Sequence, residues 1–537
     1  MSNDDNFRSS RPLVILTACF LLATFPAGAQ SILVRDAHED VKDPGLRSRS
    51  GLLPKGNLLF SGWGVTPAGR QVSISDMALK LVISPDQKML AAANGGFNDT
   101  GLTLIDLANQ TVSQFLPLPA VWNGLAFTQD GNRILVSGGN SGLIHVFKYA
   151  DGKATAADPV KPAPEALATV LGGIAIHPKT GKVYVCNEGN HELWVLDPET
   201  LALEVKIGVG QHPHSCVVGA DKQYLYVSNW GSRSVSVVDT ETNRRVRDIT
   251  VGLRPNDLAL APDGRLFVAC SGDNTVHVIP TITLEEAPVP ASPARRLWDR
   301  AREVISTSLY PQSPEGSTPD AVAVSPDSQT LFVANADNNS VMVVDISDPK
   351  VSVANGFIPV GWYPTAVAVG PDNQTLFVAN GKGLTSRPNV PPAKSSSRSK
   401  GRTAYDFIGK TLQGALSIIP RPDSAQMAAY TEQVRRNSPY TPATLRQAPV
   451  KSRSVLPDRV GQPCPIKHVL YVIKENRTYD QLFGASKDAK GRPSGNGDSN
   501  LVMYGENVAP NHHSLAREYI LLDNLYCNGE VSVDGHS

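Results

Sequence analysis

The sequence predicts a mainly β fold, a seven-bladed β-propeller, followed by the start of an α/β domain. The first observation is a recurring hairpin, typified by residues 331–345, in which the runs Leu-Phe-Val-Ala and Val-Met-Val-Val flank a polar turn. The second is the spacing of its copies, about 42–49 residues, which is the period of a four-stranded propeller blade. The third is a composition of 44 glycines, 41 prolines and 19% charged residues, which is typical of a turn-rich β protein.

Each copy contains a turn similar to Pro-Asp-Gly, and seven such turns predict seven blades. The turns lie at residues 84–86, 128–131, 177–179, 219–221, 261–264, 325–327 and 370–372. The last copy has strands at 375–379 and 414–419 but no fourth strand after them, whereas residues 70–74 form an unpaired strand before the first copy. We expect residues 70–74 to complete the seventh blade, which closes the ring and leaves no long free sheet edge.

Three copies contain a strand that ends in asparagine. These strands are Tyr-Val-Ser-Asn at residues 226–229 and Phe-Val-Ala-Asn at residues 332–335 and 377–380. In these residues the chain resembles the YVTN family of β-propeller repeats, over residues 70–420. The resemblance implies the fold and says almost nothing about chemistry.

Two insertions interrupt the propeller, at residues 281–317 and 384–413. The first is expected to contain a helix at 294–306, and four apolar residues would share one face of it: Leu297, Trp298, Ala301 and Ile305. The second is rich in Ser, Lys, Arg and Pro, which favours a mobile loop. Its basic run at 394–402 is interpreted as a solvated loop rather than a contact with an anionic surface.

After the propeller, residues 421–463 are expected to form a helix, at 424–436, and a proline-rich linker. The last part of the chain, residues 464–537, has a different character, with apolar runs that suggest the opening of an α/β domain.

Residues 1–29 predict a secretory signal, ahead of an N-terminal segment at 30–69. Arg8 and Arg11 precede an apolar segment at 13–22, and Ala-Gly-Ala at 27–29 is a small-residue cleavage site. The apolar segment is about half of the ~20 residues that a membrane span needs, which favours cleavage before Gln30 over an uncleaved anchor. No later run is long enough to span a membrane, so we expect export to the periplasm or beyond.

Charge and cysteine content narrow the choice of function. Fifty Lys and Arg residues balance fifty Asp and Glu residues, which argues against nucleic acid as a partner. Cys186 and Cys270 lie in apolar strands and are expected to be core residues. Cys464 and Cys527 are a possible disulfide, although an odd number of cysteines remains after signal removal.

The repeats place one residue of each blade at the mouth of the central channel, where the innermost strand begins. That residue follows a recurrent proline, such as Pro255 or Pro319, seven positions before the turn proline. Polar groups that converge there are suited to a small ligand or a metal, and the alternative is that they cap loop backbones. The seven positions are Leu79, Asn123, Gly172, His214, Asn256, Asp320 and Thr365.

Four histidines close together in sequence are a second candidate on the propeller: His177, His191, His212 and His214. No carboxylate or cysteine joins them at a fixed spacing. Ordinary loop histidines are therefore the favoured interpretation, and a metal site is the alternative.

Residues 467–484 carry the strongest chemical signal. An apolar run at 469–473, expected to be a buried strand, leads into Glu-Asn-Arg-Thr-Tyr-Asp at 475–480 and Phe-Gly at 483–484. In open α/β sheets, ligands bind beyond the carboxyl ends of the strands. A carboxylate and an amide at that point suit a divalent metal and phosphoryl oxygens, and a simple cap of the strand end is the alternative.

This segment resembles the opening of the phosphoesterase family of the alkaline-phosphatase superfamily, which includes bacterial phospholipase C and acid phosphatase members. The resemblance implies that Glu475 is a ligand of a divalent metal, Zn, Mn or Ca. It implies that Asn476 contacts metal or phosphate and that Asp480 fixes the turn or belongs to the pocket.

The resemblance also implies a Ser or Thr nucleophile, activated by the metal, that attacks phosphorus. Ser532 is the first candidate and Ser537 the second, and Asp534 and His536 are candidates for the same pocket. Residues 464–537 are too short for the family's domain, so the chain is expected to be a truncated, inactive copy of a propeller–phosphoesterase fusion.

Three functions remain open at this point. In the first, the propeller is a platform for a phosphate-ester substrate of the attached hydrolase. In the second, it is a non-enzymatic module that binds an envelope polymer or protein. In the third, the channel-mouth residues give the propeller a lactonase-like or dehydrogenase-like activity.

Overall fold

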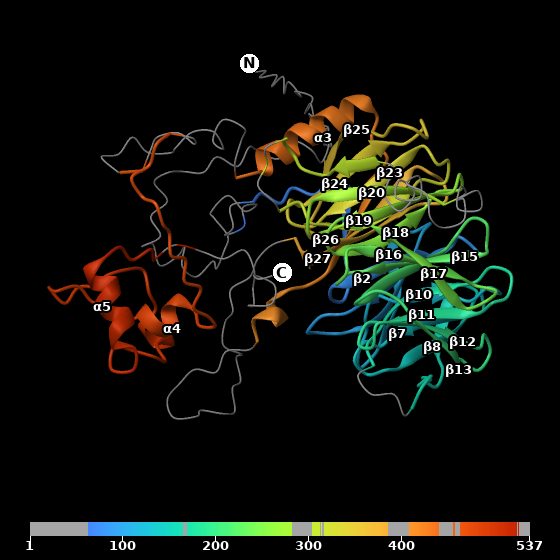
Figure 1. Ribbon diagram of the computed structural model, residues 1–537, viewed down its shortest axis with the longest axis horizontal. Helices are drawn as coiled ribbons and strands as arrows, with labels where there is room; N and C mark the ends of the chain where they lie inside the picture. The colour runs from blue at the N-terminus through green and yellow to red at the C-terminus, as the bar shows by residue number, and fades with distance from the viewer. Residues whose placement is uncertain are drawn as a thin grey trace, which may run out of the picture.

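The computed structural model describes residues 59, 63–164, 169–281, 303–311, 313, 316–384, 407–439, 455–456, 462–523 and 525. Seven four-stranded antiparallel sheets make up most of this part of the chain. Their innermost strands contact one another in sequence and the last contacts the first, so the sheets form a ring, drawn from blue to orange in Figure 1. The predicted seven-bladed propeller is confirmed.

In six blades the four strands follow in chain order from the channel outward. The first three blades comprise β2 (Ala78–Ile83), β3 (Met89–Asn94), β4 (Gly101–Asp106) and β5 (Thr111–Pro117); β6 (Leu125–Phe127), β7 (Arg133–Ser137), β8 (Ile144–Ala150) and β9 (Lys153–Ala156); and β10 (Leu171–Ile176), β11 (Val183–Asn187), β12 (Glu192–Leu196) and β13 (Leu203–Gly208). The next three comprise β14 (Pro213–Val218), β15 (Tyr224–Asn229), β16 (Ser234–Asp239) and β17 (Arg244–Thr250); β18 (Pro255–Leu260), β19 (Arg265–Cys270), β20 (Thr275–Pro280) and β21 (Glu303–Ser306); and β22 (Pro319–Val324), β23 (Thr330–Asn335), β24 (Ser340–Asp345) and β25 (Val353–Pro359).

The seventh blade joins the two ends of the propeller sequence. It contains β26 (Trp362–Val369), β27 (Thr375–Gly383) and β28 (Ala415–Pro420), and its outermost strand is β1 (Arg70–Ser73). β1 pairs antiparallel with β28, with Arg70 opposite Ile418 and Ser73 opposite Ala415. The predicted closure by residues 70–74 is confirmed, and it leaves the ring without an open gap between the first and last blades.

The cores lie between neighbouring blades. Between the third and fourth blades, for example, Tyr184 and Val227 pack together and are fully buried. Both faces of a blade are covered in this way, so the middle strands are apolar throughout rather than alternating, as in other sheets buried on two sides. Cys186 and Cys270 are fully buried in these cores, as predicted.

The helix α3 (Ser424–Asn437) covers the outer edge of the sixth blade, and the predicted helix at 424–436 is confirmed. Asp423 begins it by accepting a hydrogen bond from the backbone N–H of Gln426, an N-cap that satisfies one of the free amides of the first turn. Val434 is fully buried, and the Thr431 hydroxyl accepts a hydrogen bond from the backbone N–H of Phe357 in β25.

The predicted helix at 294–306 is wrong at its C-terminal end. Residues 303–306 form β21, the fourth strand of the fifth blade, in which Ile305 pairs with Val276. The reason is tertiary, because an unpaired β20 would leave that blade incomplete, and Ile305 is buried in its core. Residues 294–302 and the basic run at 394–402 lie outside the described residues.

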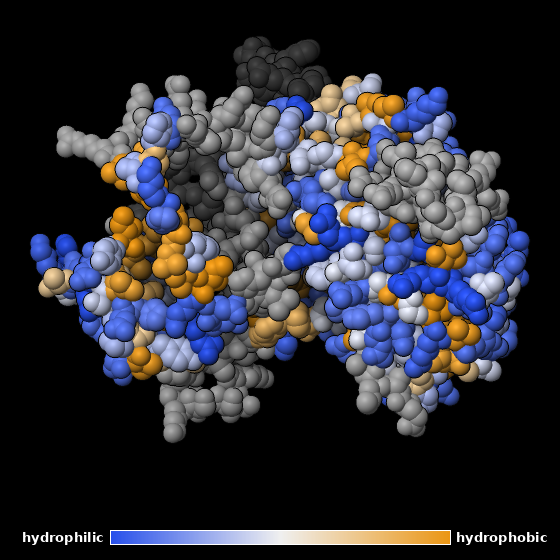
Figure 2. Space-filling model, in the orientation of Figure 1, coloured by the Kyte–Doolittle hydropathy of each residue, from blue (hydrophilic) through white to orange (hydrophobic). Residues whose placement is uncertain are grey.

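The C-terminal segment holds α4 (Tyr479–Phe483), a 3₁₀ turn at Ser499–Leu501 and α5 (Pro510–Glu518), which lie beside the propeller in Figure 1. The prediction of a buried strand at 469–473 is wrong. Within the described part of the segment no strand pairs with it, and its side chains are largely exposed, 84% for Val469 and 90% for Leu470. Figure 2 shows the apolar surface that gathers over this segment.

Two further expectations concern this part of the chain. Cys464 carries a free thiol, and its possible partner Cys527 lies outside the described residues. No helix within the described ranges is long and apolar enough to cross a membrane.

Candidate functional site at the channel mouth

β-Bulges interrupt the innermost strands at six of the seven predicted channel-mouth positions, whereas Asn123 lies in the loop before β6. In the fourth blade the pairing passes from Pro213 directly to Ser215, so His214 has no partner in the ladder. The same happens at Asp320, between Pro319 and Ala321. A bulge bends the strand and changes the direction of its side chain. Leu79 and Thr365 are skipped in the same way, and in the fifth blade the pairing skips both Asn256 and Asp257.

The bulged residues surround a cavity of about 460 Å³, within the ~300–1,000 Å³ range of small-molecule sites. Trp122 and Trp230 also line this cavity, and the inner strands add an apolar wall that includes Val82 and Val322. Six of the seven predicted positions line it: Leu79, Asn123, His214, Asn256, Asp320 and Thr365. The structure therefore brings together the residues that the repeat alignment selected.

The seventh position, Gly172, has no side chain, and its neighbours need the space. A Cβ atom there would lie 2.9 Å from Oε1 of Glu188 and 3.2 Å from Oδ1 of Asn123. The absence of a side chain at Gly172 therefore leaves room for these two polar groups beside the innermost strand of the third blade.

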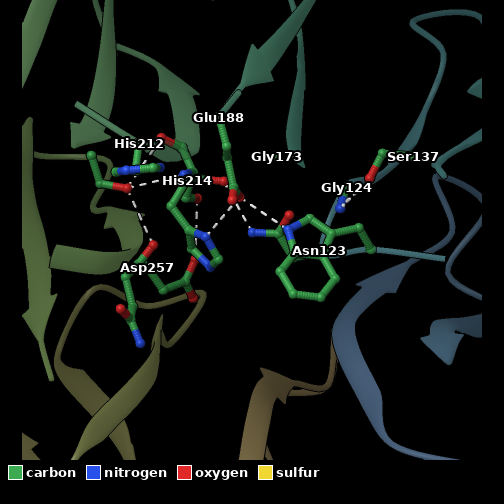
Figure 3. A network of polar contacts seen from close by, with 12 residues as sticks. Asn123, Gly124, Ser137, Gly173, Glu188, His212, His214 and Asp257 are labelled. Atoms are coloured by element: carbon green, nitrogen blue, oxygen red, sulfur yellow. Dashed lines mark hydrogen bonds and ion pairs between the residues drawn. The ribbon is translucent and has the colours of Figure 1, made fainter. Parts of the chain in front are cut away.

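A network centred on Glu188 forms one wall of the mouth (Figure 3). Nδ1 of His214 donates to Oε1 of Glu188 at 3.0 Å, and the indole Nε1 of Trp122 donates to the same oxygen at 3.0 Å. The Asn123 amide donates to the backbone carbonyl of His214 at 3.0 Å, while its own oxygen is buried without a hydrogen-bond partner among the described residues. These bonds fix the imidazole and the indole in place.

The charge of His214 depends on this network. Burial lowers its pKa, but the hydrogen bond and negative charge of Glu188, together with the charges of Asp320 and Asp257, outweigh burial and leave the pKa raised. The imidazole is thereby held closer to its protonated form at neutral pH than an ordinary histidine.

An ion pair crosses the channel. Lys80 of the first blade donates to Oδ1 of Asp257 of the fifth blade at 2.7 Å, although the two blades are far apart in the ring. Asp257 also accepts bonds from the Ser215 hydroxyl at 3.3 Å and from the backbone N–H of Val322 at 3.3 Å. The pair spans the cavity that its residues line.

Asp320 is the third carboxylate of the mouth. The side-chain N–H of Asn256 donates to Oδ1 of Asp320 at 2.6 Å. The Ser271 hydroxyl donates to the side-chain oxygen of Asn256 at 3.2 Å and so holds the amide in place. Burial raises the pKa of Asp320 to about 6, against the lowering effects of the Asn256 bond and the charge of His214. Asp320 therefore exchanges its proton in mildly acidic solution.

Glu188 and Asp257 were not among the predicted site residues. Glu188 follows the last residue of β11, and Asp257 is the second bulged residue of β18. The sequence offered a signal for Asp257 alone, because it directly follows a predicted position.

The four histidines do not form one site. Nε2 of His177 contacts the backbone carbonyl of Lys222 at 2.8 Å, and its Nδ1 accepts backbone N–H bonds within its own turn. His191 and His212 pack edge to face with ring centroids 4.9 Å apart, whereas His214 joins Glu188 in the channel. No three His, Cys, Asp or Glu side chains within the described ranges are grouped to hold a metal ion.

The C-terminal candidates are only partly placed. Glu475 and Asn476 are exposed, at the end of the extended segment that precedes α4. Asp480 accepts a hydrogen bond from the backbone N–H of Asp498 at 2.7 Å, and Thr478 is the N-cap of α4. The remaining candidates lie outside the described residues: Ser532, Asp534, His536 and Ser537.

Comparison with known families covers the propeller. The family described as SMP-30/Gluconolactonase/LRE-like region matches residues 64–231, and the WD domain, G-beta repeat, matches residues 252–279. The chain contains a seven-bladed β-propeller. Neither match reaches residues 464–537, so the phosphoesterase part of the expectation stays a prediction. No curated protein matches the chain significantly.

Three solved structures are similar to the chain, and one of them reaches a TM-score of 0.50. The structure of U3-55K is 11% identical, with a TM-score of 0.50, and the match covers 65% of this chain and 98% of that one. Kuenenia stuttgartiensis hydrazine synthase is 18% identical over 57% of this chain and 94% of its own, with a TM-score of 0.45. Streptogramin B lyase is 11% identical over 65% and 97%, also with a TM-score of 0.45. Identities this low support the fold alone.

Proposed function

We propose that this propeller binds a small polar ligand at the channel mouth. The observation that supports it is the convergence of polar residues on one cavity of about 460 Å³, where bulges place His214 and Asp320 and the loop before β6 places Asn123. If these polar side chains only capped loop backbones, their carboxylate, amide and imidazole groups would have no reason to line the same cavity. Convergent polar groups in a mainly apolar cavity are typical of a ligand site.

Affinity selection from a library of small polar compounds, read by mass spectrometry, tests this proposal. We expect compounds that the wild-type chain retains and that Asn123→Leu and Asp320→Asn lose by tenfold or more. Asn109→Leu, in an exposed turn of the first blade, is the matched control and should behave as wild type. Equal retention by all four proteins would contradict a site at the channel mouth.

The channel mouth is also the place for the lactonase-like activity that the sequence left open, the hydrolysis of a lactone ring. The description of the family that matches residues 64–231 includes a gluconolactonase. Turnover of a lactone by the wild-type chain, lost in His214→Gln, would make the ligand site an active site.

A second candidate function is the hydrolysis of phosphate esters by a domain that includes residues 464–537. The specific observation in its favour is the motif Glu-Asn-Arg-Thr-Tyr-Asp at 475–480, whose last two residues begin α4. Glu475 and Asn476 offer two oxygen ligands for a divalent metal, but the described residues supply no group of three metal-binding side chains.

The phosphoesterase proposal is tested on a protein extended through the natural downstream reading frame, with aryl phosphomonoesters and phosphodiesters in the presence of Mn²⁺, Zn²⁺ or Ca²⁺. Hydrolysis that Glu475→Gln abolishes, and that the exposed control Glu518→Gln retains, would support it. The absence of turnover with every ester and metal would remove it.

Export is part of the same proposal, since residues 1–29 resemble a secretory signal. Expression in a Gram-negative host should place the chain in the periplasm, with a mass that begins at Gln30. A full-length chain in the cytoplasmic fraction would contradict export.

A further inference from the structure

We infer that the ligand of the channel mouth is a neutral hydroxylated ring, a sugar or a cyclitol, that stacks on Trp122 or Trp230. This inference rests on the proposed ligand site and names the class of compound that it takes. Three features of the mouth support it: two exposed indoles, a mixture of hydrogen-bond donors and acceptors, and charges that are already paired.

The two tryptophans offer flat apolar faces at the cavity. Trp122 is 38% exposed and Trp230 is 37% exposed, whereas Trp194 in the core is fully buried. Both exposed indoles line the cavity that the polar ring surrounds. The C–H faces of a sugar ring are apolar enough to stack on an indole, while its hydroxyls point to the sides.

Both indoles are held in place before a ligand arrives. Trp122 donates its N–H to Glu188 at 3.0 Å. The guanidinium of Arg254 lies over the ring of Trp230, 5.0 Å from its centroid, and the ring of His212 meets it edge to face at 6.4 Å. A ligand that stacks on these faces loses little free energy to ordering of the side chains.

The polar groups at the same level match hydroxyls, which both donate and accept. The buried oxygen of Asn123 lacks a donor among the described residues, although buried polar atoms normally have a partner. Asn256 engages one oxygen of Asp320, and the second oxygen can accept a hydroxyl proton. His214 and Lys80 line the same cavity as donors.

The charge arrangement favours a neutral ligand. His214 pairs with Glu188, and Lys80 pairs with Asp257 across the channel. An anionic ligand would meet Asp257 and Asp320, and a cationic ligand would meet Lys80 and His214. A purely apolar ligand would leave Asp320 and Asn123 without partners, which is costly for groups removed from water. A hydroxylated ring avoids each of these costs.

The inference is tested by saturation-transfer NMR and tryptophan fluorescence on the full chain, with glucose, galactose, N-acetylglucosamine, maltose, cellobiose and myo-inositol as probes. We expect at least one probe to bind and its affinity to fall tenfold or more in Trp122→Ala or in Trp230→Ala. Leu253→Ala is the matched control, because Leu253 is 40% exposed, directly precedes Arg254 and does not line the cavity. It should retain wild-type affinity.

Other outcomes separate this inference from the proposed function. If none of the six probes binds while charged compounds from the polar library do, and Asn123→Leu weakens their binding, the ligand site stands and the hydroxylated-ring class is wrong. Sugar binding that both tryptophan variants retain would also overturn the inference. If neither probes nor library compounds depend on Asn123 and Asp320, the proposed function itself fails.

Discussion

Lys80 and Asp257 lie in blades on opposite sides of the ring, 177 residues apart in sequence, and their side chains meet at 2.7 Å across the channel. The innermost strands of the other blades surround this contact. The pair therefore links two halves of the propeller through the central cavity that its residues line.

Asp257→Asn should destabilise the fold by about 1–3 kcal/mol, because it removes the charged partner of Lys80 at a carboxylate that is itself largely buried. The side chain of Asp257 is 12% exposed. Urea unfolding measures the change. The control is Glu204→Gln, which removes an ion pair of the same length with Lys182 that is about one-third exposed and should cost less than ~1 kcal/mol. Equal costs for the two variants would contradict a special role for the pair across the channel.

Gly172→Ala should disturb the mouth more than the fold. The added methyl group would press on Glu188 and Asn123, and a displaced Glu188 no longer supports the protonated form of His214. We expect the pKa of His214, followed by histidine NMR, to fall in this variant. Gly208→Ala is the control, since a Cβ there meets nothing within 4 Å. An unchanged His214 pKa in Gly172→Ala would show that the network tolerates the methyl group.

The stability of the protein should fall as the pH rises through the range in which Asp320 ionises. Its pKa is raised to about 6 by burial, so the folded state holds a proton that the unfolded chain releases near its ordinary pKa of 3.8. The contribution of this proton to the free energy of unfolding is fully present below pH 3.8 and is lost by about pH 6. Its size is about 1–2 kcal/mol after allowance for solvent screening.

Asp320→Asn should remove that part of the pH dependence, measured as unfolding free energy at pH 4.5 and 7. The turn aspartates, such as Asp327 and Asp372, have lowered pKa values, in which hydrogen bonds from neighbouring residues outweigh burial, so they contribute in the opposite sense and only below about pH 4. If the unfolding free energy changes equally between pH 4.5 and 7 in wild type and variant, the assignment of this pH dependence to Asp320 is contradicted.

Val434→Ala should cost about 1–3 kcal/mol of unfolding free energy, because Val434 of α3 is fully buried on the propeller. The control Val246→Ala, at a 53% exposed position of β17, should change stability by less than about 0.5 kcal/mol. A near-zero cost at Val434 would mean that α3 adds nothing to the stability of the sixth blade.

The residues at the channel mouth could be predicted because they recur at a fixed distance before the turn of each blade. Periodicity carries that information without any knowledge of side-chain contacts. Glu188 was missed because it belongs to a strand end, where only the folded ring shows that its carboxylate reaches His214.

The errors arose where local pattern and tertiary context disagree. The spacing of the apolar residues up to Ile305 fits a helix, but pairing with β20 draws residues 303–306 into a strand. The apolar run at 469–473 has the composition of a buried strand, and a sequence pattern cannot specify which neighbour would cover it. Such a run forms a strand only when a partner is present.

The most direct measurement is a crystal structure of the chain with the compound that binds it most tightly. We predict electron density for that compound in the channel mouth, in contact with Asn123 and Asp320 and beside the Lys80–Asp257 pair. Density on the outer strands or on the C-terminal segment, with no compound in the channel, would contradict a ligand site at the mouth.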